Sequence, residues 1–204
     1  MNLKSIGIID YGLGNLASVK NSLKKIGYRV KVSKNIEVLN KVDMLVLPGV
    51  GAFPKAMNLL DEYNLIKFIQ SKSKKDFPIL GICLGMQLLA KSSMEQGHNT
   101  PGLGLISGEV VPFKENITHV GWNKLEILKD NDLSKKFNSH SMYFNHSYYL
   151  SNSKDTIITK TRYNEIFPSM ITKRNIIGVQ FHPEKSQALG TDLLKLIIER
   201  LIGA

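Results

Sequence analysis

The only cysteine of this 204-residue chain lies between two glycines, in the run Gly81-Ile82-Cys83-Leu84-Gly85. A short apolar run, Phe77-Pro78-Ile79-Leu80, precedes it, and a helix-forming run, Leu88-Leu89-Ala90-Lys91, follows it. A strand, a turn and a helix around Gly-x-Cys-x-Gly are typical of a nucleophile elbow. The glycines permit a tight turn, and the N-terminus of the helix favours a thiolate and offers N–H groups to an oxyanion. The spacing therefore predicts a nucleophilic Cys83, with a buried cysteine in an ordinary βα turn as the alternative.

A cysteine nucleophile needs a general base, and His182 is the candidate because Glu184 follows it two residues later. Residues i and i+2 of an extended backbone point to the same face, so the carboxylate would hold the imidazole tautomer and stabilise its cation. Pro183 restricts the backbone between them. An ordinary exposed turn is the alternative interpretation. The other histidines lie in polar loops, where we expect exposure (His98, His140), or in strand-like tracts, where we expect half-buried, hydrogen-bonded rings (His119, His146).

Together these residues predict a Cys83–His182–Glu184 triad that transfers acyl groups through a thioester. The N–H of Leu84, one residue after the nucleophile, is the expected first donor of an oxyanion hole. The loop Pro48-Gly49-Val50-Gly51-Ala52-Phe53 follows an apolar run and is expected to supply the second donor, Val50. Loops at the carboxyl ends of strands are where open α/β sheets bind ligands.

The apolar runs that must position these residues predict one domain, residues 1–204, of the α/β class. We expect a mixed, mainly parallel central sheet flanked by helices, and an additional antiparallel region within residues 103–179. The expected strands of the first half are 5–9, 28–32, 43–47 and 77–80, and the expected helices are 16–26, two within 54–75, and 189–202. The turn Gly12-x-Gly14 lacks the third glycine of a dinucleotide fingerprint, which favours a helix-packing turn.

Composition restricts the function further. Hydrophobic residues make up 43% of the chain, no apolar run approaches the ~20 residues of a membrane span, and the N-terminus lacks a signal peptide, so we expect a cytoplasmic protein without membrane contact. The net charge is +10, but the lysines are scattered and not interleaved with aromatic residues, which favours a solvated surface over nucleic-acid binding. A single cysteine excludes an internal disulfide and a cysteine-based zinc site, and we expect no metal and no cofactor.

The elbow, with Phe181-His182-Pro183-Glu184, resembles the class I, triad-type glutamine amidotransferases. Further motifs narrow the resemblance to the glutaminase subunits of imidazole glycerol phosphate synthases, which serve histidine biosynthesis. These motifs are Asp10-Tyr11-Gly12-Leu13-Gly14-Asn15-Leu16, the loop 48–53, Gly121-Trp122-Asn123, Tyr143-Phe144-x-His146-Ser147-Tyr148 and Gln180 to Ser186. The resemblance implies that Cys83 attacks the side-chain amide of L-glutamine, that His182 moves the protons and that Glu184 orients His182.

The resemblance also implies residues around the triad. The substrate glutamine would be held by Gly51, Gln87, Glu95, Ser147 and Tyr148. The partner is a (β/α)8-barrel cyclase subunit, and the residues at the subunit interface and ammonia gate would be Trp122, Asn123, Tyr143 and Lys185. In that family the Gly49–Val50 peptide reorients to complete the oxyanion hole, driven by the partner.

Two departures from the family pattern leave the pathway open. Thr118-His119-Val120 stands where the family has Pro-His-Met, and Asn145 stands where it has an apolar residue. Similar subunits supply ammonia to sugar-amidinating synthases, which is one alternative. An independent cysteine hydrolase or peptidase is a second, and a non-enzymatic binding module is a third.

Overall fold

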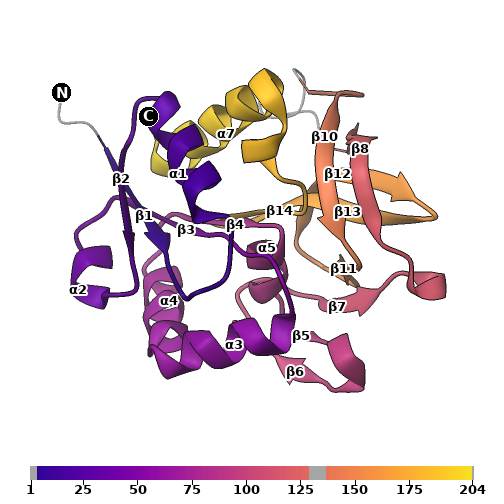
Figure 1. Ribbon diagram of the computed structural model, residues 1–204, viewed down its shortest axis with the longest axis horizontal. Helices are drawn as coiled ribbons and strands as arrows, with labels where there is room; N and C mark the ends of the chain where they lie inside the picture. The colour runs from indigo at the N-terminus through magenta and orange to yellow at the C-terminus, as the bar shows by residue number, and fades with distance from the viewer. Residues whose placement is uncertain (1–3, 129–136, 204) are drawn as a thin grey trace.

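The computed structural model describes residues 4–128 and 137–203, and its main feature is a large mixed sheet (Figure 1). Its strands run in the order β2-β1-β3-β4-β14-β13-β12-β9, and the first five are parallel, whereas β13, β12 and β9 each pair antiparallel to the strand before. The strands are β1 (Ser5–Ile9), β2 (Arg29–Ser33), β3 (Met44–Leu47), β4 (Ile79–Ile82), β9 (Glu126–Ile127), β12 (Thr156–Tyr163), β13 (Glu165–Lys173) and β14 (Ile176–Val179). The expected mixed, mainly parallel sheet is confirmed.

Helices cover both faces of the parallel part (Figure 1). They are α1 (Leu16–Lys25), α2 (Ile36–Leu39), α3 (Phe53–Glu62), α4 (Leu65–Lys74), α5 (Leu84–Leu88) and α7 (Gln187–Ile202). Side chains alternate along β3, so Met44 and Val46 pack in the cluster that contains α1 and α7, whereas Leu45 and Leu47 pack with α3, α4 and α5. The sheet is therefore buried on both faces, which explains why its strands are continuous apolar runs.

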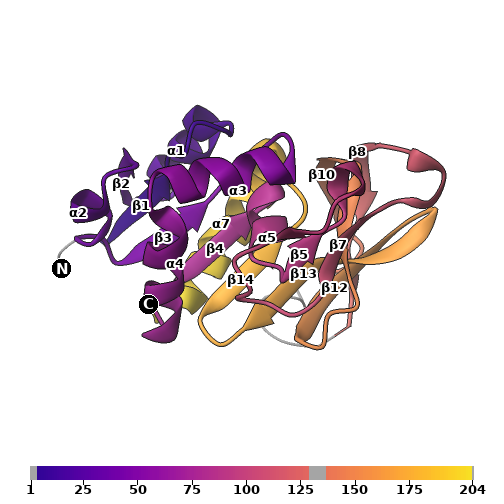
Figure 2. The ribbon, with the colours of Figure 1, turned by 90° about the horizontal axis from the view of Figure 1, so that it is seen from below.

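Two smaller sheets, antiparallel except for the β5–β7 pair, form the additional region, which lies at the far end of the molecule from β2 (Figure 2). One pairs β10 (Ser141–His146) with β8 (His119–Lys124). The other has the order β11-β7-β5-β6, with β5 (Ser92–Ser93), β6 (Thr100–Pro101), β7 (Glu109–Pro112) and β11 (Tyr148–Ser151). Short 3₁₀ helices complete the chain: η1 (Glu95–Gly97), η2 (Lys114–Asn116) and η3 (Pro183–Lys185).

The helix after Cys83 is shorter than the sequence suggests. α5 ends at Leu88, although Leu89, Ala90 and Lys91 are good helix formers. The carbonyl groups of Leu88, Leu89 and Ala90 instead accept hydrogen bonds from the backbone of the loop 103–106. A tertiary contact thus replaces the next helical turn.

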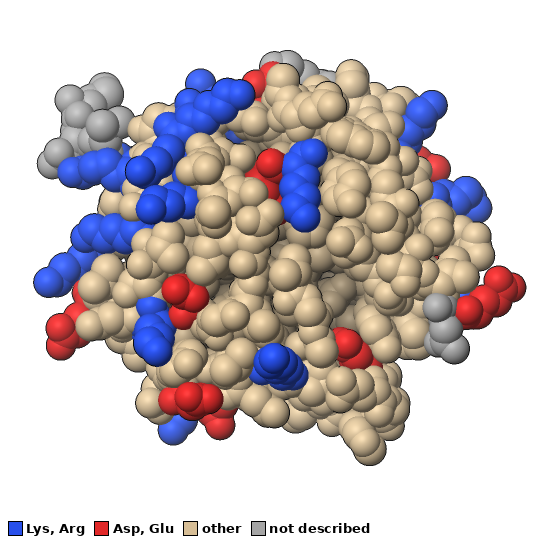
Figure 3. All heavy atoms as spheres, viewed as in Figure 1, with Lys and Arg blue, Asp and Glu red and all other residues tan. Residues whose placement is uncertain are grey.

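Basic side chains are dispersed over the face drawn in Figure 3, with carboxylates between them. They gather most densely over the N-terminal elements α1 and β2, away from the antiparallel region. None of the helices within the described ranges is long and apolar enough to cross a bilayer.

Candidate active site

Cys83 occupies a strained elbow between β4 and α5. Its backbone has φ 53° and ψ −112°, and its N–H donates to the carbonyl oxygen of Val179 on β14 at 2.8 Å. A Cβ on Gly85 would overlap the carbonyl oxygen of Leu47, and a Cβ on Gly81 would lie 2.7 Å from the carbonyl oxygen of Gly85. Both flanking glycines are therefore required for the close packing of α5 against the sheet, as the spacing predicted.

His182 and Glu184 form the expected pair, but not on the expected backbone. The imidazole Nδ1 lies 2.8 Å from Glu184 Oε1, and the two side chains are 2% and 1% exposed. Only His182 is extended, because Pro183 begins the 3₁₀ helix η3, so the prediction of an extended segment was wrong. One 3₁₀ turn brings the carboxylate back to the ring instead. The His182 N–H donates to the carbonyl oxygen of Tyr143, which fixes the base to β10.

The electrostatics of the pair favour an imidazolium. Burial alone would lower the pKa of His182, but the charges of Cys83 and Glu184 and their hydrogen-bonding capacity outweigh burial and raise that pKa. In the described part of the chain, His182 Nε2 and Glu184 Oε2 are the buried side-chain atoms without a hydrogen-bond partner. Nε2 is thus the atom left free to exchange a proton with the thiol.

Two polar groups outside the triad contact the sulfur. The carbonyl oxygen of Asn145 and the amide Nε2 of Gln180 each lie 3.8 Å from Cys83 Sγ. Gln180 is fully buried, and its Oε1 accepts a hydrogen bond from Gln87 at 3.2 Å. The Gln87 amide also donates to the carbonyl oxygen of Tyr148 at 2.7 Å. A chain of amides therefore connects the sulfur to β11.

Neither Gln180 nor the Asn145 carbonyl was predicted to contact the nucleophile. The available signal for Gln180 is its place at the carboxyl end of an apolar strand, directly before Phe181-His182. The parallel register Val179↔Ile82 then puts Gln180 beside Cys83. That register cannot be read from the sequence of either strand alone.

The sulfur opens onto a cavity of about 220 Å³. The predicted oxyanion donors and the predicted glutamine-binding residues all line it with Cys83: Val50, Leu84, Gly51, Gln87, Glu95, Ser147 and Tyr148. Thr118, Asn145 and His146 complete the lining and were not predicted. Residues from five segments of the chain thus meet at one opening.

Two side chains that line the cavity, Glu95 and Ser147, form hydrogen bonds with other groups of the protein. Glu95 Oε2 accepts a hydrogen bond from the N–H of Phe53, at the first turn of α3, at 2.8 Å. Burial raises the pKa of Glu95, and this hydrogen bond lowers it in part. The hydroxyl groups of Ser147 and Thr118 lie 2.8 Å apart. Both side chains are therefore held by a neighbouring group of the protein.

The glycine-rich loop after β3 packs tightly on the elbow. A Cβ on Gly49 would lie 3.0 Å from Leu84 Cβ and would overlap the Tyr11 hydroxyl. That hydroxyl donates to the carbonyl oxygen of Pro48 at 2.8 Å, and burial raises its pKa, so it stays a donor. Gly51 has φ 109°, a conformation that favours glycine. Val50, between these fixed points, is 38% exposed.

Three of the four predicted interface residues form one cluster. The rings of Trp122 and Tyr143 meet edge to face with centroids 6.1 Å apart, and Lys185 Nζ lies 5.8 Å from the Tyr143 ring. Trp122 is 49% exposed, and its neighbour Val120 is 59% exposed. Asn123 belongs elsewhere, because it follows Trp122 on β8 and faces the other side of that strand.

Asn123 ends a hydrogen-bonded row of two buried histidines. Its Nδ2 lies 3.3 Å from His119 Nε2 and donates to the carbonyl oxygen of Arg162 at 2.9 Å. His119 Nδ1 lies 3.2 Å from His146 Nε2, and His146 Nδ1 lies 2.8 Å from the carbonyl oxygen of Tyr148. Burial lowers the pKa of His119 to about 4 and that of His146 to about 3. Both rings are therefore neutral at pH 7, as satisfied structural histidines.

An α/β sheet with a cysteine elbow, a paired histidine and a cavity at the strand ends defines a class of enzyme. The chain belongs to the glutamine amidotransferase class-I family, whose sequence profile matches residues 7–199. A solved structure described as a glutamine amidotransferase superposes with a TM-score of 0.75 at 19% identity, covering 98% of this chain and 99% of its own. A glutamine amidotransferase from Thermotoga maritima gives a TM-score of 0.72 at 17% identity, covering all of both chains.

Curated relatives carry a more particular name. Imidazole glycerol phosphate synthase subunit HisH of Lactococcus lactis is 44% identical over 203 residues, which cover 98% of this chain and 100% of the relative. The subunit HisH of Caldanaerobacter subterraneus is 45% identical and covers 93% of this chain and 95% of itself. The subunit HisH of Aquifex aeolicus is 44% identical, and the match covers 92% of this chain and 93% of the relative.

Proposed function

We propose that this chain is the glutaminase subunit of an imidazole glycerol phosphate synthase. It hydrolyses L-glutamine to glutamate and ammonia through a Cys83 thioester, and it passes the ammonia to a cyclase subunit that makes imidazole glycerol phosphate and AICAR in histidine biosynthesis. The observation that carries the proposal is the cavity in which Cys83 meets every residue predicted to hold glutamine. The full-length similarity to HisH subunits supports the pathway.

The chemistry begins when His182 Nε2 takes the thiol proton. Cys83 Sγ then attacks the side-chain amide carbon, and the carbonyl electron pair moves to oxygen. When this tetrahedral intermediate collapses, the C–N bond breaks, His182 gives its proton to the departing nitrogen and ammonia leaves. Water then attacks the thioester carbon with His182 as the base, which releases glutamate and restores the thiol. Glu184 holds Nδ1 throughout and stabilises the imidazolium.

The oxyanion is stabilised by the backbone. Leu84 begins α5, so its N–H has no intrahelical acceptor, and the residue lines the cavity beside the sulfur. Val50, on the loop that packs against Leu84, supplies the second N–H in our proposal. Each such donor contributes about 3–4 kcal/mol to transition-state stabilisation in comparable acyl-transfer sites.

The synthase partner in this proposal is a (β/α)8-barrel cyclase. Its docking site is the exposed face of β8 and β10, with Trp122, Tyr143 and the neighbouring Lys185. Tyr143 also accepts the backbone hydrogen bond that holds His182, so the docking face and the triad share β10. This connection gives the partner a direct mechanical route to the catalytic base.

Cys83→Ala tests the proposal. We expect the assembled synthase to lose glutamine-dependent synthesis, by about 10⁴-fold or more as for other nucleophile removals, and to keep synthesis from added ammonium salts. Both activities are measured as cyclase product formation. Loss of both would show that Cys83 serves folding or docking rather than catalysis.

The alternatives give different results in the same assay. A sugar-amidinating synthase would leave the barrel cyclase inactive with this chain and glutamine. Val120, from the departure at Thr118-His119-Val120, lies opposite the second departure, Asn145, on the β8–β10 pair. A peptidase would cleave peptides without any partner and leave glutamine intact. A binding module would fail to react with a glutamine-like diazo-ketone at Cys83.

A further inference from the structure

A second cavity, of about 440 Å³, lies at the end of the sheet opposite the triad. It is built where the segment entering β4 and the turn entering β14 meet: the Asn175 amide donates to the carbonyl oxygen of Asp76 at 3.0 Å. Cys83 follows the other end of β4, four residues of strand away, or roughly 13 Å. The cavity is therefore separate from the catalytic one, and none of the residues that line the catalytic cavity lines it.

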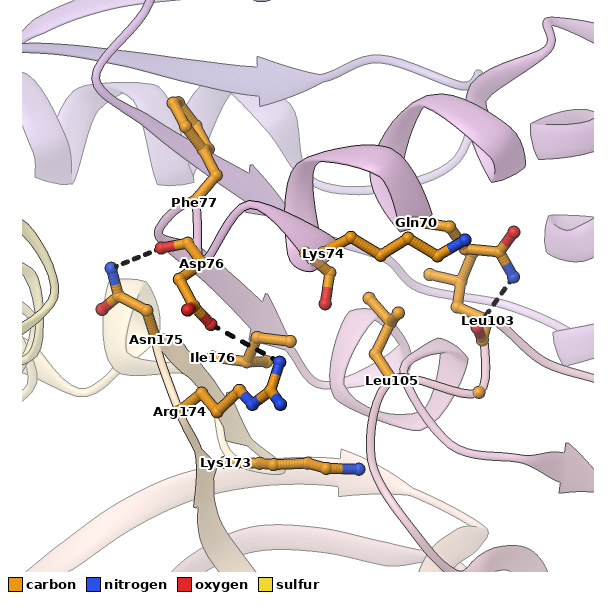
Figure 4. A pocket seen from close by; sticks show the side chains of 12 residues that line it. Gln70, Lys74, Asp76, Phe77, Leu103, Leu105, Lys173, Arg174, Asn175 and Ile176 are labelled. Atoms are coloured by element: carbon orange, nitrogen blue, oxygen red, sulfur yellow. Dashed lines mark hydrogen bonds and ion pairs between the residues drawn. The ribbon is translucent and has the colours of Figure 1, made fainter.

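The floor of this cavity is apolar. Leu105 and Ile176 place their side chains at the cavity, whereas the ring of the lining residue Phe77 points away from them (Figure 4). The Gln70 amide is fixed, because it donates to the carbonyl oxygen of Leu103 at 3.0 Å.

The rim is cationic. Lys74 from α4, Lys173 at the end of β13 and Arg174 from the β13–β14 turn all line the cavity, and in Figure 4 the Lys74 side chain extends toward Gln70. Arg174 contacts Asp76 at 3.8 Å with both side chains more than 60% exposed, and Lys173 contacts Asp155 at 3.8 Å. The long, solvated Arg174–Asp76 pair contributes about 0–1 kcal/mol and yields readily to a better anion. Within residues 4–128 and 137–203, no ion pair engages Lys74.

We propose that this cavity binds a small organic anion, with an apolar or aromatic body on the floor and a phosphate or carboxylate between Lys74 and the β13–β14 turn. Its volume lies within the 300–1,000 Å³ of typical small-molecule sites. An apolar floor with a few convergent charged groups is the composition that binds such amphipathic ligands. The lining has three cations, Lys74, Lys173 and Arg174, and a single carboxylate, Asp76, so its net charge is positive.

The test is calorimetric titration of the full chain with phenyl phosphate, after Cys83 has been alkylated with iodoacetamide to block the catalytic cavity. We expect phenyl phosphate to bind at least tenfold more tightly than inorganic phosphate, which lacks the body, or benzyl alcohol, which lacks the charge. Lys74→Gln should weaken it about five- to tenfold, as expected for one charge-assisted contact. Lys25→Gln, an exposed lysine on α1, should leave it unchanged. Benzoate in the same titration distinguishes a carboxylate site from a phosphate site.

Several results would overturn the proposal. These are no heat of binding up to 10 mM phenyl phosphate, equal affinity in the Lys74→Gln and Lys25→Gln variants, and binding that disappears when Cys83 is alkylated. Amide shifts in NMR spectra should fall on the residues of this cavity, and shifts confined to the elbow would contradict it. Failure of this test leaves the glutaminase proposal intact, because the titration measures binding at this cavity and not the chemistry at Cys83.

Discussion

Substitution of Gln180 should alter the reactivity of the Cys83 thiol while all three triad residues stay unchanged. Its amide donates to Cys83 Sγ, and a donor stabilises negative charge developing on sulfur. Gln180→Leu keeps the volume and removes the donor. We expect alkylation of Cys83 by iodoacetamide at pH 7.5 to slow about three- to tenfold, corresponding to roughly 1 kcal/mol for one buried hydrogen bond.

The matched control is Gln187→Leu, the same chemical change at an exposed position. Its alkylation rate should equal that of the wild type, and thermal unfolding should show that both variants are folded. A wild-type alkylation rate in Gln180→Leu would show that the amide serves only to hold Gln87.

The sequence predicted best the residues whose contacts are with near neighbours in the chain. Gly81 and Gly85 flank Cys83 within one turn, and Glu184 reaches His182 within one 3₁₀ turn. The contacts that it did not predict, from Gln180 and from the Asn145 carbonyl, join segments 97 and 62 residues away from the cysteine. They depend on strand register, which is set by the whole sheet.

At the scale of elements, the buried His119–His146 pair between β8 and β10 should make stability depend on pH. Their pKa values of about 4 and 3 in the folded chain lie below the ~6.5 of an unfolded histidine, so the unfolded state binds more protons as pH falls from 6.5 toward 3. The free energy of unfolding should therefore fall with decreasing pH in this window, by up to about 1.4 kcal/mol per pH unit for each ring.

Urea unfolding between pH 7 and pH 4 measures that slope. His119→Gln should flatten it, because one of the two groups can no longer gain a proton on unfolding. Tyr163→Phe keeps the ring that stacks on His119 at 4.1 Å and should leave the slope unchanged even where it lowers stability. Identical slopes in the wild type and His119→Gln would mean that other groups carry the acid sensitivity.

Element boundaries were less predictable than element types. The helices expected at 16–26 and 189–202 correspond to α1 and α7, whose apolar residues repeat along one face. In the antiparallel region, the run from Tyr143 to Tyr149 is divided between two strands, with Ser147 between β10 and β11. The two strands join different sheets, and only tertiary pairing decides where the first one ends.

At the scale of the whole molecule, continuous apolar runs and the alternation of apolar and polar residues were enough to predict a mainly parallel half and an antiparallel half. The order of strands in the main sheet was not predictable in the same way, because β4 pairs with β14 from almost a hundred residues later. That pairing brings the elbow to His182, and the β8–β10 pair then covers the base on its outer side. The triad therefore sits at the seam between the two halves.

Trp122, on the outer face of this seam, should dominate binding to the proposed cyclase. A half-exposed tryptophan braced edge to face by Tyr143 is the type of residue that forms a hot spot. We expect Trp122→Ala to weaken association about 10- to 100-fold, or roughly 1.4–2.7 kcal/mol, measured by titration calorimetry with the purified cyclase.

The control variant is Leu128→Ala, at the same 49% exposure but outside the β8–β10 face, and it should bind like the wild type. Diazo-ketone labelling of Cys83 in the isolated Trp122→Ala chain should match the wild type, which separates docking from chemistry. Undiminished affinity in Trp122→Ala would place the partner on another face of the molecule.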